Sequence, residues 1–315
     1  MPTSSKKNFL ISVVIPVFNE EKNISLLLQR LLPVLQPYSY EAIFIDDGSG
    51  DKTASLIKNL AKKEKRIKLV SFQRNFGHQQ ALAAGYQYAK GEAVISMDSD
   101  LQDPPEIIPR MIEKWQNGVE IVYARRSRRE ADTFFKKMTA LWFYKLINFL
   151  SDTPIPENIG DFRLLDRKVV NFLNQLPERS IFLRGLVAWG GFTEDYVYFD
   201  REKRAGGKTH YTLMKMFNFA IDGITSFSIK PLRLAIVLGF FTSSLGFLGI
   251  FYALYRRLFL PHQYWVTGWT ALFVSVMFMG GIQLLSIGII SEYIGKIYQQ
   301  IQQRPRYLVK ETVNL

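Results

Sequence analysis

The fold is decided by residues 93–105, which read AVISMDSDLQDPP. Ala93–Ser96 has strand character, and two carboxylates, Asp98 and Asp100, follow it before Gln102 and a Pro-Pro pair. Strand alternation directs Asp98 and Asp100 to the same side, and the end of a strand leaves both free of the sheet. Two carboxylates and an amide suit a hard divalent ion that also holds substrate phosphates, as Mg²⁺ commonly does. Taken alone, the same residues could form a solvated turn that caps the next helix.

Strands and helices alternate around this stretch. Apolar runs that end in polar residues or glycine read as buried strands at 9–17, 41–45, 68–72 and 93–97. Helices with an apolar face lie between them, and we expect Asn19 to cap the first, which runs to about Leu35. This spacing predicts an α/β fold with a mostly parallel sheet, whose ligands bind beyond the carboxyl ends of the strands. Further strands are expected at 120–124 and 196–199.

Length and composition limit the classes of protein to consider. The chain has 315 residues, 48% of them hydrophobic, which predicts one large domain and an additional element. It contains no cysteine, so a disulfide framework and thiol chemistry are excluded. A net charge of +12 suits nucleic acid, anionic lipid or a phosphorylated substrate. The first apolar run, interrupted by Ser12 and Pro16, is too short for a signal peptide, so we expect the N-terminal domain to stay in the cytoplasm.

Four motifs occur in order along the first third of the chain: VIPVFNE at 14–20, DDGS at 46–49, RNFG at 74–77 and MDSDLQDPP at 97–105. Together they resemble the family 2 glycosyltransferases, which have the Rossmann-like GT-A fold. Within that family the chain is similar to the branch of dolichol-phosphate mannose synthases and polyisoprenyl-phosphate glucosyltransferases. The resemblance implies transfer of a sugar from a nucleotide to a lipid phosphate, and it favours a metal site at residues 98–102.

The resemblance also implies which residues form the site. The nucleotide pocket would be lined by Pro16, Phe18, Glu20, Asp47 and Asp98. Within that pocket Asp47 would hold the uracil ring. The metal ion, Mg²⁺ or Mn²⁺, would be bound by Asp98, Asp100 and Gln102 and held against the diphosphate. There it would stabilise the negative charge that develops on the leaving group. Helix capping is the alternative role for Glu20 and Asp47. We expect His78 to pack or to cap, and we assign it no chemistry.

A basic run follows the strand expected at 120–124, and then comes a segment rich in aromatic residues. Residues 134–150 contain six aromatic side chains and three lysines, which fits an amphipathic helix at a membrane interface, with packing on the catalytic domain as the alternative. In the related synthases, an arginine after this strand and a cation on the next helix grip the phosphate of the acceptor lipid. Arg126 and Lys136 occupy those places here, although a lysine supplies only a point charge.

Asp161 lies where family 2 enzymes often carry an acidic residue near the acceptor. The mannose-synthase branch has small residues at this place, so the difference favours the glucosyltransferase-like branch. A phosphate monoester is already anionic at neutral pH and hardly requires a general base. We therefore expect Asp161 to position the acceptor or the sugar, with base catalysis as the second interpretation. A salt bridge to Arg163 or another arginine is the structural alternative.

Residues 201–211 combine basic side chains with glycines, which is typical of a mobile loop that closes over phosphates. The segment resembles the Arg-x-Gly-x-Ser-Lys loop of the family. Its charged positions are matched by Arg204 and Lys208. These two side chains would bind the departing diphosphate.

Two uncharged segments, 234–255 and 265–291, each reach the roughly 20 residues that cross a bilayer. The short linker between them predicts a hairpin with both ends on one side of the membrane. The basic flanks predict that this side is the cytoplasm, although Arg256 and Arg257 in the linker are weak evidence for the opposite orientation. Glycines on both segments would allow close packing and a homo-oligomer. The expected organisation is a GT-A domain at 1–210 with an interface helix at 134–150, a juxtamembrane helix at 211–229, a transmembrane hairpin at 230–295 and a basic cytoplasmic tail at 296–315.

The favoured interpretation is an inverting transferase in the bacterial plasma membrane. It moves a sugar, with glucose favoured, from UDP to a membrane polyprenyl phosphate. The same chemistry with GDP-mannose or a UDP-aminosugar stays open, because donor choice depends on few contacts. A processive polysaccharide synthase is disfavoured, since the chain lacks a Gln-x-x-Arg-Trp motif. A non-catalytic membrane scaffold is the alternative from another class. Nucleic acid is not expected as a partner, because the arginines cluster beside membrane-facing aromatics.

Overall fold

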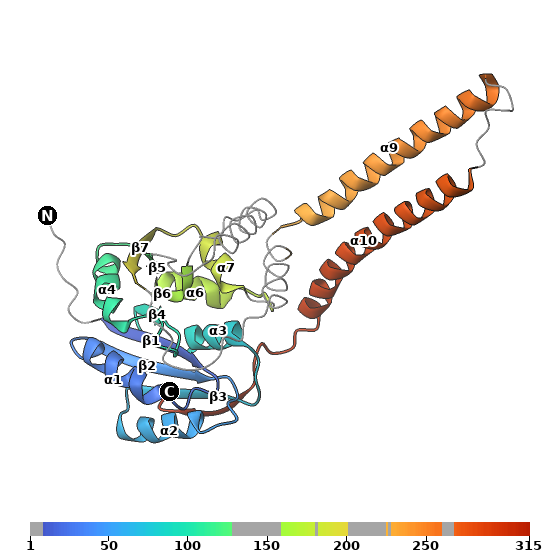
Figure 1. The fold of residues 1–315 in the computed structure, drawn as a ribbon. Coiled ribbons are helices and arrows are strands. Elements are labelled where there is room, and N and C mark those ends of the chain that lie inside the picture. The colour runs from blue at the N-terminus through green and yellow to red at the C-terminus, as the bar shows by residue number, and fades with distance from the viewer. Residues whose placement is uncertain (1–8, 128–158, 180–181, 201–224, 226–227, 260–267) are drawn as a thin grey trace.

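The computed structural model describes residues 9–127, 159–179, 182–200, 225, 228–259 and 268–315. These residues form an α/β domain and two long helices that extend from it (Figure 1). The sheet of the domain has eight strands in the order β7-β5-β6-β4-β1-β2-β3-β8. A mostly parallel α/β sheet was expected from the alternation of strands and helices, and this prediction is confirmed.

The centre of the sheet is parallel. Its strands are β1 (Leu10–Val17), β2 (Ser39–Asp46), β3 (Ile67–Phe72) and β4 (Ala93–Ser96). Their connections form α1 (Ile24–Leu35), α2 (Thr53–Lys63) and α3 (His78–Tyr88). After β4 come the short 3₁₀ helix η1 (Pro105–Ile107) and α4 (Ile108–Gln116). Strand β1 pairs with both β2 and β4, so the carboxyl ends of these three strands lie side by side.

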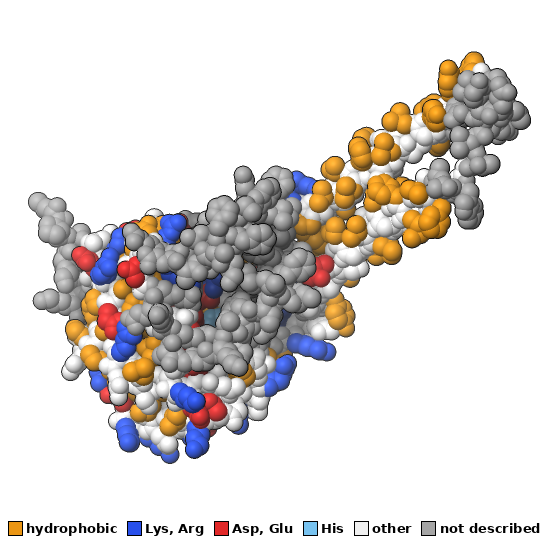
Figure 2. All heavy atoms as spheres, viewed as in Figure 1, with side chains coloured by type: hydrophobic (Ala, Val, Ile, Leu, Met, Phe, Trp, Pro, Cys, Tyr) orange, Lys and Arg blue, Asp and Glu red, His pale blue; other side chains and the backbone are white. Residues whose placement is uncertain are grey.

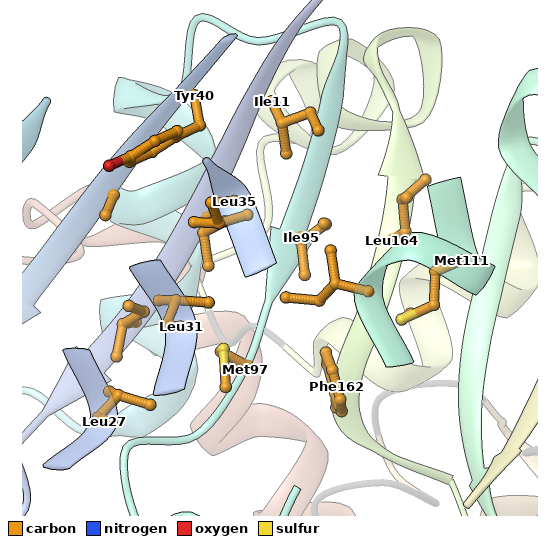
Figure 3. Close-up of a cluster of buried hydrophobic side chains, with 14 of the residues drawn as sticks. Ile11, Leu27, Leu31, Leu35, Tyr40, Ile95, Met97, Met111, Phe162 and Leu164 are labelled. Atoms are coloured by element: carbon orange, nitrogen blue, oxygen red, sulfur yellow. The ribbon is translucent and has the colours of Figure 1, made fainter. Parts of the chain in front are cut away.

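The two faces of the sheet are covered by different helices, because alternate residues of each strand point to opposite faces. One face packs against α1, α2 and α4, and Figure 3 shows Ile95 between the α1 leucines (Leu27, Leu31 and Leu35) and Met111 of α4 in this cluster. The other face packs against α3, where the ring of Tyr86 is fully buried. The fold therefore has three layers, with helices on both sides of the sheet.

The remaining strands make the sheet mixed. They are β5 (Ile121–Arg126), β6 (Ile159–Asp166), β7 (Glu194–Phe199) and β8 (Val309–Val313), with α6 (Arg167–Gln175) and α7 (Leu183–Trp189) between β6 and β7. Strand β6 lies between β4 and β5 and is antiparallel to both. This insertion places Asp161 beside the end of β4, because Ser96 pairs with Arg163 and donates a hydrogen bond to the Asp161 carbonyl.

The predicted cap of the first helix is wrong. Helix α1 begins at Ile24, and Asn19 has a positive φ of 57° in the loop before it. The Oδ1 atom of Asn19 accepts a hydrogen bond from the Gly50 amide at 2.9 Å, and its own amide donates to Ser49 Oγ at 2.9 Å. Asn19 therefore joins the loops that follow β1 and β2, because its short polar side chain tolerates the left-handed conformation.

Helices α9 (Lys230–Phe259) and α10 (Trp269–Ile301) are each long and apolar enough to cross a membrane. Hydrophobic side chains cover them along their length, whereas charged side chains gather on the α/β domain (Figure 2). An exposed apolar surface of this extent requires a lipid or protein environment. The interface helix predicted at 134–150 lies outside the described residues, as does nearly all of the juxtamembrane helix predicted at 211–229.

The segment predicted as a basic tail, 296–315, differs from that expectation. Helix α10 continues to Ile301, and β8 then pairs antiparallel with β3, with Leu69 opposite Val313 and Phe72 opposite Val309. The outer edge of β3 offers unpaired backbone groups, which a further strand satisfies. The chain therefore returns from α10 to complete the eight-stranded sheet.

Candidate active site

The predicted nucleotide-binding residues lie at the carboxyl ends of β1 and β2. Pro16 is buried within β1 and pairs in register with Ile45, whereas Phe18, just beyond the strand, is 45% exposed. The amide of Glu20 donates to Thr53 Oγ1 at 2.9 Å, and its carboxylate accepts from the Asn23 side chain. Phe18 is thus available to a ligand, while Glu20 also connects the start of α1 to α2.

Asp47 is buried at the end of β2 and binds the loop that precedes α3. Its Oδ1 accepts from the Phe76 amide at 2.7 Å, and its Oδ2 accepts from the Gly77 amide at 2.9 Å. Burial raises the pKa of Asp47 above its ordinary value, although the two amides act in the opposite direction. The carboxylate therefore holds residues 74–77 against the turn after β2, and its remaining lone pairs could still accept a hydrogen bond from a base.

The Asp-x-Asp pair lies immediately after β4. Asp98 Oδ1 is enclosed by protein and accepts no hydrogen bond from the described residues, although its side chain as a whole is 38% exposed. Asp100 Oδ1 accepts from the Gln102 amide at 3.1 Å in a turn where Leu101 has a φ of 60°. Within the described part of the chain, no three Asp, Glu or His side chains converge as a complete metal shell. A metal here would need further ligands from a substrate.

A cluster of charged side chains surrounds Asp161, which is 4% exposed. Arg184 of α7 donates to both carboxylate oxygens, at 3.2 and 2.9 Å, and the fully buried Arg163 donates at 3.2 Å. His78, the first residue of α3, lies between two acidic groups. Its Nε2 is 3.4 Å from Asp161 Oδ2 and 3.5 Å from Asp98 Oδ1. The cluster therefore joins α3, β4, β6 and α7 at one point.

The charges of this cluster shift the pKa values of its members. Burial favours the neutral acid, but Arg184, His78 and Arg163 together hold the pKa of Asp161 well below its ordinary range. Desolvation opposes the imidazolium, yet Asp161 and Asp98 raise the pKa of His78. Burial also raises the pKa of Asp98, with Asp161 and Asp100 adding to the effect and His78 opposing it. Asp161 is thus a poor proton acceptor, whereas His78 and Arg184 only partly offset the effect of burial on Asp98.

The residues predicted to contact the lipid phosphate are only partly described. Arg126 ends β5, and its Nη2 lies 3.7 Å from Asp103 Oδ1, a buried carboxylate that follows the Asp-x-Asp pair. The Arg126 side chain is 31% exposed and thus partly accessible beside the β4 end. Lys136, Arg204 and Lys208 lie outside the described residues.

Two residues of the cluster were missed by sequence reasoning. His78 was expected only to pack or to cap, and Arg184 was not predicted as a site residue. The RNFG motif directly before His78 could have indicated a loop end near the site. Arg184 gives no such signal, because it lies in a short helix whose position depends on the antiparallel insertion of β6.

Residues 12–173 match the sequence model of a family described as glycosyl transferase family 2. The chain belongs to glycosyl transferase family 2. Residues 230–297 match a second model, described as the GtrB C-terminal hairpin, which covers α9 and most of α10. The prediction of a family 2 glycosyltransferase with two C-terminal apolar helices is confirmed.

Family 2 relatives match this chain along nearly its whole length. The SfII prophage-derived bactoprenol glucosyl transferase of Shigella flexneri is 45% identical over 304 residues, which cover 96% of this chain and 98% of that protein. The glycosyltransferase YkcC of Bacillus subtilis (strain 168) is 45% identical over 306 residues, covering 96% and 94%. A solved structure of glucosyl-3-phosphoglycerate synthase from Mycobacterium tuberculosis, with Mn²⁺, UDP-glucose and phosphoglyceric acid, is 18% identical with a TM-score of 0.47, covering 69% of this chain and 78% of that one. That structure is too distant to assign a role to any residue here.

Proposed function

We propose that this family 2 enzyme transfers glucose from UDP-glucose to a membrane polyprenyl phosphate, giving a polyprenyl-phosphate glucose and UDP. The observation that carries the proposal is the 45% identity, across 96% of this chain, to a protein named a bactoprenol glucosyl transferase. Bactoprenol is a polyprenol, so its phosphate is confined to the bilayer. Helices α9 and α10 would keep the catalytic domain beside such an acceptor.

A divalent ion, Mg²⁺ or Mn²⁺, fits the end of β4. The Oδ1 atom of Asp98 is enclosed and accepts no hydrogen bond from the described residues, although His78 Nε2 lies 3.5 Å from it. A bound cation would compensate this buried charge further. Asp100 and Gln102 lie in the same turn, and a site with two carboxylates commonly takes its other ligands from phosphates and water. When bound, the ion would stabilise the negative charge of the leaving diphosphate.

The side chains around β1 and β2 would bind the donor. The exposed ring of Phe18 offers an apolar surface to the uracil, and the buried Pro16 keeps the end of β1 extended behind it. Glu20 orders the loop between them and α1 through Thr53 and Asn23. Asp47 would contact the uracil while its bonds to the 76–77 amides fix the pocket wall.

The acceptor phosphate would attack the anomeric carbon from the side opposite UDP. A bond forms between a phosphate oxygen and that carbon as the bond to the UDP oxygen breaks, so the configuration inverts. The attacking phosphate is already anionic, and no proton has to be removed by the protein. Asp161 therefore acts by orienting Arg184 and His78 beside the reacting groups, not as a base. Arg126 and Lys136 would hold the acceptor phosphate, and Arg204 and Lys208 the diphosphate.

The membrane arrangement forms part of the proposal. With α9 and α10 as a transmembrane hairpin, the α/β domain and the returning C-terminal segment lie on the same side, as their shared sheet requires. The basic flanks of the hairpin favour the cytoplasmic side of a bacterial plasma membrane, where UDP-glucose is made. Close packing at the glycines of the hairpin would permit a homo-oligomer.

The test uses the detergent-purified full chain with a short-chain polyprenyl phosphate and Mg²⁺. Radiolabelled UDP-glucose, GDP-mannose and UDP-N-acetylglucosamine are supplied separately, and label entering the organic phase is counted. We expect transfer from UDP-glucose, lost in Asp100→Asn and kept in Asp195→Asn, an acidic control that pairs with Lys114 away from the site. Transfer only from another donor would retain the mechanism and replace the sugar. Absence of both transfer and donor binding would refute the proposal and favour the scaffold.

A further inference from the structure

The segment that returns from α10 contacts the α6–α7 connection as well as β3 and α3, elements that adjoin the candidate site. We name Gln300–Asn314 the return segment. At its start, the Gln300 side chain accepts from the Arg179 amide at 2.8 Å and donates to the Pro177 carbonyl at 3.1 Å. These two partners lie in the connection between α6 and α7, the helix that carries Arg184. Further along, β8 completes the sheet next to β3.

Tyr307 lies at the point where the return segment meets the end of β3, the strand next to β2. Its ring stacks on Phe72, the last residue of β3, with centroids 4.8 Å apart and an interplanar angle of 14°. Its hydroxyl donates to the Gln87 side chain of α3 at 2.5 Å. The neighbouring Leu308 carbonyl accepts from the Gln73 amide at 2.9 Å. The return segment therefore holds the beginning of the loop between β3 and α3.

The contacts continue from Tyr307 to Asp47. Phe72 packs edge-to-face on Phe76, with centroids 5.8 Å apart and an interplanar angle of 87°. The guanidinium of Arg74 covers the ring of Phe76 at 4.3 Å. The Phe76 amide in turn donates to Asp47 at 2.7 Å. Each ring in this series is in contact with the next, so a shift of the Tyr307 ring would displace the loop that Asp47 binds.

The turn after β2 has little freedom to move independently of this loop. A Cβ added to Gly48 would lie 2.5 Å from the carbonyl carbon of Arg74, so the two backbones are already in close contact. A shift of residues 73–77 must therefore be followed by the turn that contains Asp47 and Gly48. Close-packed interiors transmit displacements in this way because no void absorbs them.

We propose that Tyr307 is a positioning residue for the nucleotide pocket, acting through Phe72 and Phe76 on the loop bound by Asp47. The inference rests on the proposed function, in which Asp47 and the turn after β2 receive the donor nucleotide. An edge strand that only protected β3 would need the backbone pairing of β8 but not the ring of Tyr307. The return segment thus links the end of α10 to donor binding.

The experiment compares Tyr307→Ala, Tyr307→Phe and Lys310→Ala in the detergent-solubilised full chain. Lys310 is exposed on the same segment and serves as the matched control. Hydrogen exchange of residues 73–77 is followed by mass spectrometry without nucleotide, and UDP is titrated in the presence of Mg²⁺. We expect Tyr307→Ala to exchange faster at 73–77 and to bind UDP about threefold to tenfold more weakly, as the loss of one aromatic pair implies. Tyr307→Phe keeps the stacked ring and should behave like the wild type.

The readouts separate positioning from a general loss of stability. A merely destabilised protein would contain fewer active molecules and show a lower kcat, with the UDP affinity of the folded fraction unchanged. Unaltered exchange at 73–77 in Tyr307→Ala, or faster exchange in all strands alike, would overturn the proposal. Failure of the wild type itself to bind UDP would instead refute the proposed donor, and the exchange data would still decide whether Tyr307 positions the loop.

Discussion

Replacing Asp161 by asparagine tests whether this carboxylate is a buried counterion or a catalytic base. Asn keeps the shape and one acceptor but removes the charge that faces Arg163, Arg184 and His78. Arg163 is fully buried, and its remaining described side-chain partner is the Tyr86 hydroxyl at 3.3 Å. Removing one member of a buried ion pair costs about 3–5 kcal/mol, because the other charge is left uncompensated. The folded state should weaken by an amount in that range.

The assay is thermal unfolding in detergent, followed by tryptophan fluorescence at one fixed scan rate. A loss of this size should lower the apparent Tm of Asp161→Asn by on the order of 10 °C. Asp195→Asn, which breaks an exposed pair with Lys114, should change stability by no more than about 1 kcal/mol. Glucose transfer is measured in the same preparations.

An unchanged Tm in Asp161→Asn would refute the counterion argument. If transfer were then lost while the protein stayed as stable as the wild type, base catalysis would become the better explanation. A lowered Tm together with residual transfer at low temperature would support positioning, because the attacking phosphate needs no proton acceptor. The two roles therefore predict opposite combinations of stability and activity.

Three further outcomes are expected. Burial disfavours the Glu41 carboxylate, but hydrogen bonds from Lys68, Ser12 and the Lys90 amide lower its pKa in the folded state below its ordinary value. Its stabilisation should be full at neutral pH and lost as the pH falls through the folded pKa, and Glu41→Gln should remove this part of the acid sensitivity in pH-dependent unfolding. Gly48→Ala should destabilise the protein by about 1–3 kcal/mol and weaken UDP binding, because Gly48 has a φ of +73° and its added Cβ would collide with the Arg74 backbone. Gly50 is the control: a Cβ added there meets nothing within 4 Å, so Gly50→Ala should change neither the stability nor the UDP affinity. Chelation of divalent ions should abolish transfer, and added Mg²⁺ or Mn²⁺ should restore it; activity in excess chelator would contradict the metal site.

The parallel half of the sheet was predictable because its strands are continuous apolar runs. Strands β1, β2, β3 and β4 are buried on both faces, and such strands show their character in the residues themselves. The acidic motifs follow the ends of these strands, so the parallel topology predicted that Asp47 and Asp98 lie at the same edge of the sheet. The positions of these residues agree with expectation, while their roles as ligands remain predictions.

Strand β6 was not predictable in the same way. Its sequence, IGDFRLLD, includes a charged arginine that is fully buried in the structure. Burial of Arg163 is tolerated only because Asp161 and Tyr86 meet it, and these contacts depend on antiparallel pairing with β4. The site residues His78 and Arg184 depend on the same pairing. Long-range contacts of this kind leave no periodic signal in a single sequence.

Strand β8 has a consequence for biosynthesis. It follows both apolar helices in the chain, while its partner β3 precedes them. During translation the edge of β3 must therefore stay open until the whole hairpin has been made, and an open edge is prone to pair with other chains. Closing a loop of this length also makes late pairing slow. The sheet thus acquires its final strand only after both apolar helices have been synthesised.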